Sequence, residues 1–212
     1  LFTSVSDGKD MIGGAITDVD PSIVIPPNPT FQDLANAISL LGGGGNGGIK
    51  SVQSGTITLQ MYDQITDVSI SSVDPSKSIV FIRVSANVGT PQADNLCVAC
   101  EIIDDTTVRL ERYDASQTYL PTVTWTVIEF DNVKSLQTGR QAGTANPTIV
   151  NINSVDVSKS VLLFSHLVTA GSTSSGYFLT RGRISSPTTL EFIASASPPS
   201  FHIYVWQVVE FE

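Results

Sequence analysis

One block of sequence occurs twice in this chain of 212 residues, first as Ile49-Lys50-Ser51-Val52-Gln53-Ser54-Gly55 and again, 84 residues later, as Val133-Lys134-Ser135-Leu136-Gln137-Thr138-Gly139. Three further blocks recur in the same order at offsets of 82, 82 and 81 residues: 73–80 with 155–162, 106–108 with 188–190, and 125–130 with 206–211. Four blocks in the same order, at nearly constant offsets, indicate a duplication. Residues 49–130 and 133–212 are therefore predicted to be two copies of one unit.

Each copy has the pattern of an all-β domain. Polar and apolar residues alternate in Ser54–Leu59 and in Thr148–Asn153, which is typical of strands with one buried face. Asp74–Lys77 is typical of a turn, and the apolar run Ser78–Ile82 that follows favours a central strand. About six short strands in each copy predict a β-sandwich or a small barrel. The predicted fold is mainly β, with two tandem antiparallel β-sandwich (or small barrel) repeats preceded by a short helical N-terminal segment.

The first 41 residues have helical patterns instead. Thr30 and Asp33 are typical of a helix start, because the threonine hydroxyl can accept a hydrogen bond from the amide of Asp33. A shorter helix is expected around Met11–Ile16, before the proline-rich loop Pro21–Pro29. Two short helices bury little surface alone, so we expect them to dock on another protein; packing on the chain's own β-domain is the alternative. Apolar residues recur at helical spacing before Gly42 and are the docking candidates: Phe31, Leu34, Ile38 and Leu41.

Residues 42–48 consist of six glycines and Asn46, a composition typical of a flexible tether. The predicted organisation is a helical anchor at 1–41, a Gly-rich linker at 42–48, the first β-repeat at 49–130 and the second at 133–212. Only Asp131 and Asn132 separate the two repeats, so we expect them to stack rigidly.

Charge and hydropathy exclude two classes of partner. The chain has 11 Lys and Arg against 20 Asp and Glu, a net charge of −9. This acidic excess argues against nucleic acid, which needs basic surfaces. The sequence has no apolar stretch near the ~20 residues that span a bilayer, so we expect no membrane insertion. The excess lies in residues 1–48 and 49–130, whereas 131–212 is neutral.

Residues that perform chemistry are scarce. Cys97 and Cys100 lie three apart on a predicted strand, so they face opposite sides and are expected to be buried thiols. His166 and His202 have no counterpart in the first copy and are expected to be polar fillers. A Ca²⁺ site is the alternative to a solvated turn for the acidic residues around Asp104 and Asp105. We therefore predict no catalytic residue, no metal, no cofactor and no enzymatic activity.

Exposed aromatic rings are the remaining candidates for ligand contact, because rings stack on sugars. Trp125 and Trp206 occur in a duplicated block and are expected to belong to the core. Tyr113, Tyr119 and Tyr177 lie in segments that are not duplicated and are the candidate ligand-binding residues.

This organisation resembles virion proteins of tailed bacteriophages and prophages. The N-terminal pattern Gly8-Lys9, Ala15-Ile16-Thr17-Asp18 and Thr30-Phe31 is similar to the start of many phage tail and fibre proteins of Gram-positive hosts. The repeated unit, which begins [Ile/Val]-Lys-Ser and ends Val-[Ile/Val]-Glu-Phe, is similar to units of phage tail proteins.

The resemblance implies a structural virion protein of the tail fibre, baseplate or capsid decoration. It also implies docking on other virion proteins through residues 1–41 and a homo-oligomer, with a trimer favoured. The alternative is a receptor- or carbohydrate-binding adhesin for host attachment, whose partner would be a host-surface glycan.

Overall fold

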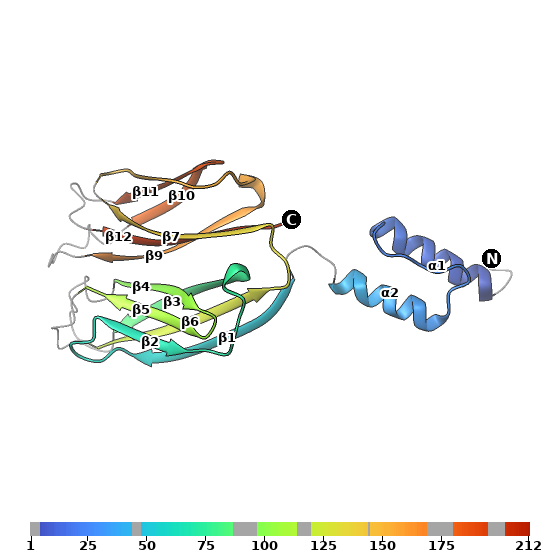
Figure 1. Cartoon of the computed structure of the whole chain (residues 1–212), viewed down its shortest axis with the longest axis horizontal. Coiled ribbons are helices and arrows are strands. Elements are labelled where there is room, and N and C mark those ends of the chain that lie inside the picture. The colour runs from blue at the N-terminus through green and yellow to red at the C-terminus, as the bar shows by residue number, and fades with distance from the viewer. Residues whose placement is uncertain are drawn as a thin grey trace. The chain divides into compact units, whose positions relative to one another are not determined.

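The structure is a computed structural model that describes residues 5–43, 48–86, 97–113, 120–143, 145–168, 180–194 and 202–212. The chain divides into two compact units, Leu1–Gly48 and Ile49–Glu212, which are treated separately below. The first unit is helical and the second consists of β-strands (Figure 1). The predicted class, mainly β with a short helical N-terminal segment, is confirmed.

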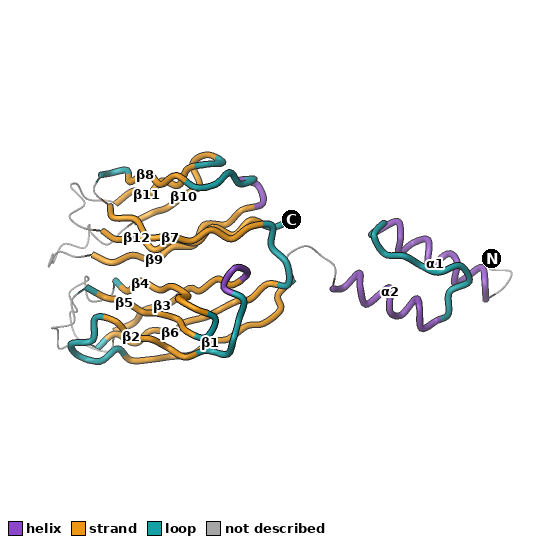
Figure 2. Tube along the Cα trace, in the orientation of Figure 1, coloured by secondary structure: helices purple, strands orange, loops and turns teal. Residues whose placement is uncertain are grey.

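The helical unit contains α1 (Val5–Val19) and α2 (Phe31–Gly43), shown in purple in Figure 2. At the start of α2, the Thr30 hydroxyl accepts a hydrogen bond from the amide of Asp33 at 3.1 Å. The Asp33 carboxylate accepts in return from the Thr30 amide at 2.7 Å, so that two otherwise unpaired amides are satisfied. The predicted start of α2 is thereby confirmed. The expectation that the upstream helix is the shorter one is wrong, because α1 continues through its glycines and has 15 residues against 13.

The loop between the helices runs back along α1. Ile25 lies beside Gly13, where a Cβ atom would come within 3.2 Å of its side chain. The Lys9 ammonium lies 5.8 Å from the centre of the Phe31 ring, and Leu34 lies further along, next to Gly13. The two helices therefore run in the same direction. Among the residues whose side chains are described, their buried core consists of Ile16, Ile23, Leu34 and Ala37, with Ile25 packed against it.

The β-unit contains six strands in each repeat. Repeat 1 has β1 (Ile49–Thr58), β2 (Ile65–Ser69), β3 (Ser78–Ala86), β4 (Val98–Asp104), β5 (Thr107–Arg112) and β6 (Pro121–Phe130). Repeat 2 has β7 (Ser135–Gly143), β8 (Thr148–Asn151), β9 (Ser160–Val168), β10 (Thr180–Ser186), β11 (Thr189–Ala194) and β12 (His202–Glu210). Repeat 1 forms the antiparallel sheets β1-β6-β3 and β2-β5-β4, and repeat 2 forms the equivalent sheets β7-β12-β9 and β10-β11-β8. Each repeat is a sandwich of two sheets.

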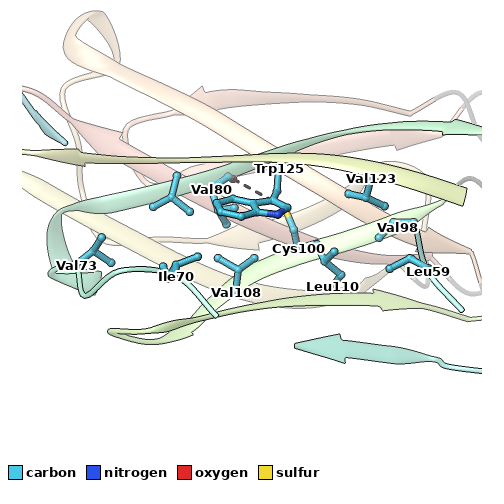
Figure 3. Packing of buried hydrophobic residues seen from close by; sticks show 11 residues of the cluster. Leu59, Ile70, Val73, Val80, Val98, Cys100, Val108, Leu110, Val123 and Trp125 are labelled. Carbon is cyan, nitrogen blue, oxygen red and sulfur yellow. Dashed lines mark hydrogen bonds between the residues drawn. The ribbon is translucent and has the colours of Figure 1, made fainter. Parts of the chain in front are cut away.

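The core of repeat 1 lies between its two sheets (Figure 3). Trp125 is 9% exposed and its ring covers Gly55 on the neighbouring strand, where a Cβ atom would lie only 2.6 Å from the ring. In repeat 2, Trp206 covers Gly139 in the same way, at 2.5 Å. This contact explains why Gly and Trp recur in the duplicated blocks and confirms that both tryptophans belong to the core.

The duplicated polar residues form the same contacts in both repeats. The Glu129 carboxylate accepts hydrogen bonds from the Lys50 ammonium at 2.8 Å, the Ser51 hydroxyl at 3.1 Å and the Asp74 amide at 3.0 Å. Hydrogen bonding from Lys50 and from the Asp74 amide holds the pKa of Glu129 below its usual value. The equivalent set in repeat 2 is Glu210 with Lys134, Ser135 and Asp156. These contacts join the first strand, the last strand and the turn before the third strand.

Repeat 2 covers an open edge of repeat 1. Val80 lies on β3, which has no strand beyond it in its sheet. The side-chain oxygen of Gln207 on β12 accepts from the Val80 amide at 2.9 Å, and its side-chain nitrogen donates to the Val80 carbonyl at 2.6 Å. On the facing sheet, the Ser165 hydroxyl accepts from the amide of Cys100 in β4 at 2.9 Å. Polar side chains of repeat 2 therefore bond to backbone groups of β3 and β4 that a further strand would otherwise pair with.

Apolar and charged contacts complete this interface. Ala99 of repeat 1 packs against Val205 and Leu167 of repeat 2. The Arg140 guanidinium donates to Glu101 and to Glu111 of repeat 1, both at 2.6 Å. The two repeats belong to one compact unit, Ile49–Glu212.

Candidate functional site

The four predicted docking residues occupy different positions in the helical unit. Phe31 is 66% exposed, whereas Leu34 is 3% exposed and lies in the core between the helices. The side chains of Ile38 and Leu41 lie outside the described residues, although both belong to α2. Leu34 therefore holds the helical unit together, and Phe31 is the described candidate that reaches the surface.

The two cysteines are free and buried, as predicted. Burial raises the pKa of Cys100 to about 12, so this thiol stays protonated at neutral pH. The described residues include no group of three metal-ligating side chains that could hold an ion. Neither described helix has the length and apolar character needed to cross a membrane.

The histidines have closer neighbours than the sequence suggested. His166 Nε2 lies 3.7 Å from Cys97 Sγ, across the boundary between the repeats. The His202 ring is fully buried and stacks on His166, with 5.7 Å between ring centres. Burial lowers the pKa of His202, whose ring nitrogens make no hydrogen bond in the structure. The contact of His166 with Cys97 arises because β9 and the residue before β4 lie side by side at the interface.

A small cavity lies at the junction of the repeats, between Glu101, Ile102 and Trp206. Its volume is about 130 Å³. Pockets for cofactors and substrates are usually several times larger, about 300–1,000 Å³. This cavity is therefore not the candidate site.

The three predicted ligand-binding tyrosines are not brought together in the described part of the chain. Tyr113 follows β5 and is 47% exposed, whereas Tyr119 and Tyr177 lie outside the described residues. The structure adds Tyr62, which is 72% exposed and has a φ of 70°. A bulky residue rarely adopts this left-handed conformation, and such strain is often found at functional sites. The sequence gives no signal for it, since Gly or Asn usually occupies such a position.

Tyr62 and Tyr113 belong to the same end of the β-unit. The Arg112 amide donates to the carbonyl of Gln64 at 2.9 Å, and the Gln64 side chain donates to the carbonyl of Tyr113 at 2.9 Å. This end follows β1 and β5 and lies opposite to Ile49, where the chain enters the unit (Figure 1). Met61 and Ile65 are also exposed here, by 41% and 51%. These exposed apolar and aromatic side chains make this end the candidate contact site of the β-unit among the described residues.

Buried Arg112 holds this surface in place. Its side chain is on the core-facing side of β5, and the residue is only 1% exposed. The guanidinium donates to the carbonyl of Asp63 at 3.0 Å and to the carbonyl of Gln60. Two backbone carbonyls of the loop are thus fixed from inside, on either side of Tyr62, and the tyrosine points outward from an anchored turn.

Comparison of the chain with protein-family models, curated proteins and solved structures finds no match. The fold and the site define a helical unit followed by a pair of packed β-sandwiches with an aromatic contact surface at one end.

Proposed function

We propose that this chain is a structural protein of a tailed-phage virion, in which the helical unit docks on another virion protein. The β-unit is the displayed part, as a module of the tail fibre, the baseplate or the capsid decoration. The proposal includes a homo-oligomer, with a trimer favoured, and no enzymatic activity. It combines the resemblance of the N-terminal pattern and the repeated unit to phage proteins with the surface of the helical unit.

The surface of the helical unit carries this proposal. Of the side chains described in residues 8–37, four are buried in its core, yet five large apolar ones are exposed by 43% or more. These are Met11, Ile12, Val19, Val24 and Phe31. An apolar surface this large for such a small unit is typical of a protein contact.

Particle incorporation tests the docking. The full chain carrying Phe31→Asp is compared with Gln32→Asp, because the neighbouring Gln32 is exposed and polar. Both variants add one negative charge at the start of α2, but only the first removes an apolar contact. We expect co-sedimentation with virions to fall at least tenfold for Phe31→Asp and to persist for Gln32→Asp. Equal incorporation of the two variants would contradict docking through Phe31.

Light scattering of the full chain measures the oligomeric state.

A receptor-binding role is a second candidate, favoured by Tyr62 and Tyr113. Two exposed rings on an anchored turn suit recognition of a host-surface glycan. We expect the full chain to bind host cell-wall polysaccharide, and Tyr62→Asn to weaken the binding. Asparagine tolerates the left-handed backbone, so this change removes the ring without straining the turn. Absence of binding by the unaltered chain would refute this role.

A further inference from the structure

We infer that Tyr62, Asp63 and Tyr113, here called the tyrosine tip, bind an ammonium group carried by the target. This inference rests on the receptor-binding role proposed above and specifies the chemistry of its ligand. The ligand would be a cationic substituent on a surface polymer, such as a quaternary or primary ammonium.

The three residues adjoin the paired ends of β2 and β5. Ile65 on β2 lies opposite Glu111 on β5, and the Arg112 amide bonds to the next residue back, Gln64. Asp63 precedes Gln64 and Tyr113 follows Arg112, and the side chain of Gln64 bonds to the carbonyl of Tyr113. Both residues therefore lie at the same end of two neighbouring strands, where one small ligand could contact them. Tyr62 is the next residue along the chain.

The tip is also held rigid before any ligand binds. Arg112 fixes the carbonyls of Gln60 and Asp63 from the core side, and the side chain of Gln64 holds the carbonyl of Tyr113. A preorganised surface loses less conformational entropy on binding, which raises affinity. This rigidity favours recognition by the tip itself over a passive exposed loop.

The chemistry of the tip selects a positive charge. The face of a tyrosine ring attracts cations, and the exposed carboxylate of Asp63 adds a full negative charge beside it. Nearby cations on this sheet face are already matched, since Arg109 pairs with Asp67 and Arg140 pairs with two glutamates. Repeat 1 as a whole has ten acidic residues against five basic ones. The buried guanidinium of Arg112 already donates to the carbonyls of Gln60 and Asp63, whereas the carboxylate of Asp63 is exposed at the surface, so the tip favours a cation over an anion. A neutral sugar would leave the carboxylate unused.

Calorimetric titration of the full chain with choline tests the inference, with 3,3-dimethylbutan-1-ol as a neutral ligand of the same shape. We expect choline to bind at least tenfold more tightly than the alcohol. Tyr62→Asn and Asp63→Asn should each weaken choline binding about tenfold, the order of a desolvated cation–π contact. The matched control is Asp131→Asn, which removes an exposed charge after β6, at the other end of the repeat. Melting temperatures confirm that the variants fold.

The outcomes separate this inference from the receptor-binding role. Equal affinity for choline and the alcohol, or choline binding that is unchanged in Tyr62→Asn and Asp63→Asn, would overturn the ammonium inference. If cell-wall polysaccharide still bound in a Tyr62-dependent way, the receptor-binding role would stand without it. Failure of the unaltered chain to bind both choline and cell-wall polysaccharide would remove both.

Discussion

The central strands β6 and β12 occupy the same place in their repeats but present different outward faces. In β6 the outward residues are Thr122, Thr124 and Thr126. The hydroxyls of Thr122 and Thr124 pair with threonine hydroxyls of β1 at 3.2 Å. The equivalent residues in β12 are Ile203, Val205 and Gln207. Thr124 is exposed, whereas Val205 is 3% exposed because it lies against repeat 1.

This difference shows where the two copies have diverged. The core contacts between Gly and Trp and the buried glutamates are the same in both, because each sandwich needs them to fold. On the central strand, the outward face has changed where repeat 2 covers repeat 1. Edge strands left open favour aggregation. In repeat 1 the open edge is covered, whereas in repeat 2 the edge strand β10 has exposed Arg181 and Arg183. The positive charge of these two arginines disfavours the stacking of another sandwich against β10.

Gln207→Ala should give the largest effect. The change leaves the amide of Val80 buried without a partner and its carbonyl with only the weak 3.9 Å contact from the Cys100 thiol, and each unsatisfied group costs about 1–3 kcal/mol. We expect the free energy of unfolding to fall by about 2–5 kcal/mol in urea denaturation. The control is Gln137→Ala, because Gln137 makes the same two hydrogen bonds to the backbone of Asn153 at the surface.

Water can replace those surface bonds, so Gln137→Ala should cost no more than about 1 kcal/mol. If the two variants lost the same stability, the contact at Val80 would not be what joins the repeats.

Gly139→Ala should have the next largest effect and should be the same in both repeats. A Cβ atom would lie 2.5 Å from the Trp206 ring, and overpacking of this kind costs about 1–3 kcal/mol. Gly55→Ala, which crowds Trp125 in the same way, should cost a similar amount in thermal melts. Gly14→Ala is the control, because nothing lies within 4 Å of its new methyl group. Unequal losses from Gly139→Ala and Gly55→Ala would show that the two cores differ.

These contacts show which parts of the structure were accessible to sequence reasoning. The duplication could be recognised in the sequence because the contacts of Gly55 with Trp125 and of Glu129 with Lys50 need the same residue types in each copy. Alternation of polar and apolar residues then located the strands. Stacking of the two repeats was predicted from their two-residue connection, but the residues of the interface were not, since a glutamine in a strand gives no sign that its side chain pairs with a distant backbone.

Only part of the candidate site could be predicted from the sequence. Tyr113 was singled out because it is aromatic and lies outside the duplicated blocks. Tyr62 was missed because its exposure depends on a left-handed turn anchored by Arg112, whose contact with Asp63 joins residues 49 positions apart. Leu34 was placed on the docking surface because helical spacing shows which residues share a face but not which neighbour that face meets.

Exchange of the outward residues Thr124 and Val205 should have a smaller effect on stability, and only the change in repeat 2 should be costly. Val205→Thr places a hydroxyl in the buried interface and should cost about 1–2 kcal/mol. The reciprocal change Thr124→Val is at an exposed position and should stay within about 0.5 kcal/mol. Urea denaturation of both variants measures the asymmetry. Equal losses would mean that the face of β12 is not buried against repeat 1 in solution.

The smallest expected effect is a pH dependence confined to repeat 2, where His202 replaces Pro121 of repeat 1. Burial lowers the pKa of His202 in the folded chain. Below about pH 6.5 the unfolded chain therefore takes up a proton that the folded chain does not, and stability decreases as the pH falls. One such proton contributes at most about 1.4 kcal/mol between pH 6.5 and 5.5.

His202→Phe keeps a ring in contact with His166 and Tyr204 and removes the titrating group. We expect the decrease in the free energy of unfolding between pH 7.5 and 5.5 to be smaller in this variant. Glu129→Gln is the control, because hydrogen bonding holds the pKa of Glu129 below 4.5, outside this interval. It should lower stability equally at both pH values. If the free energy of unfolding fell by the same amount in His202→Phe, the pH dependence would belong to another group. The two repeats would then not differ in pH dependence because of His202.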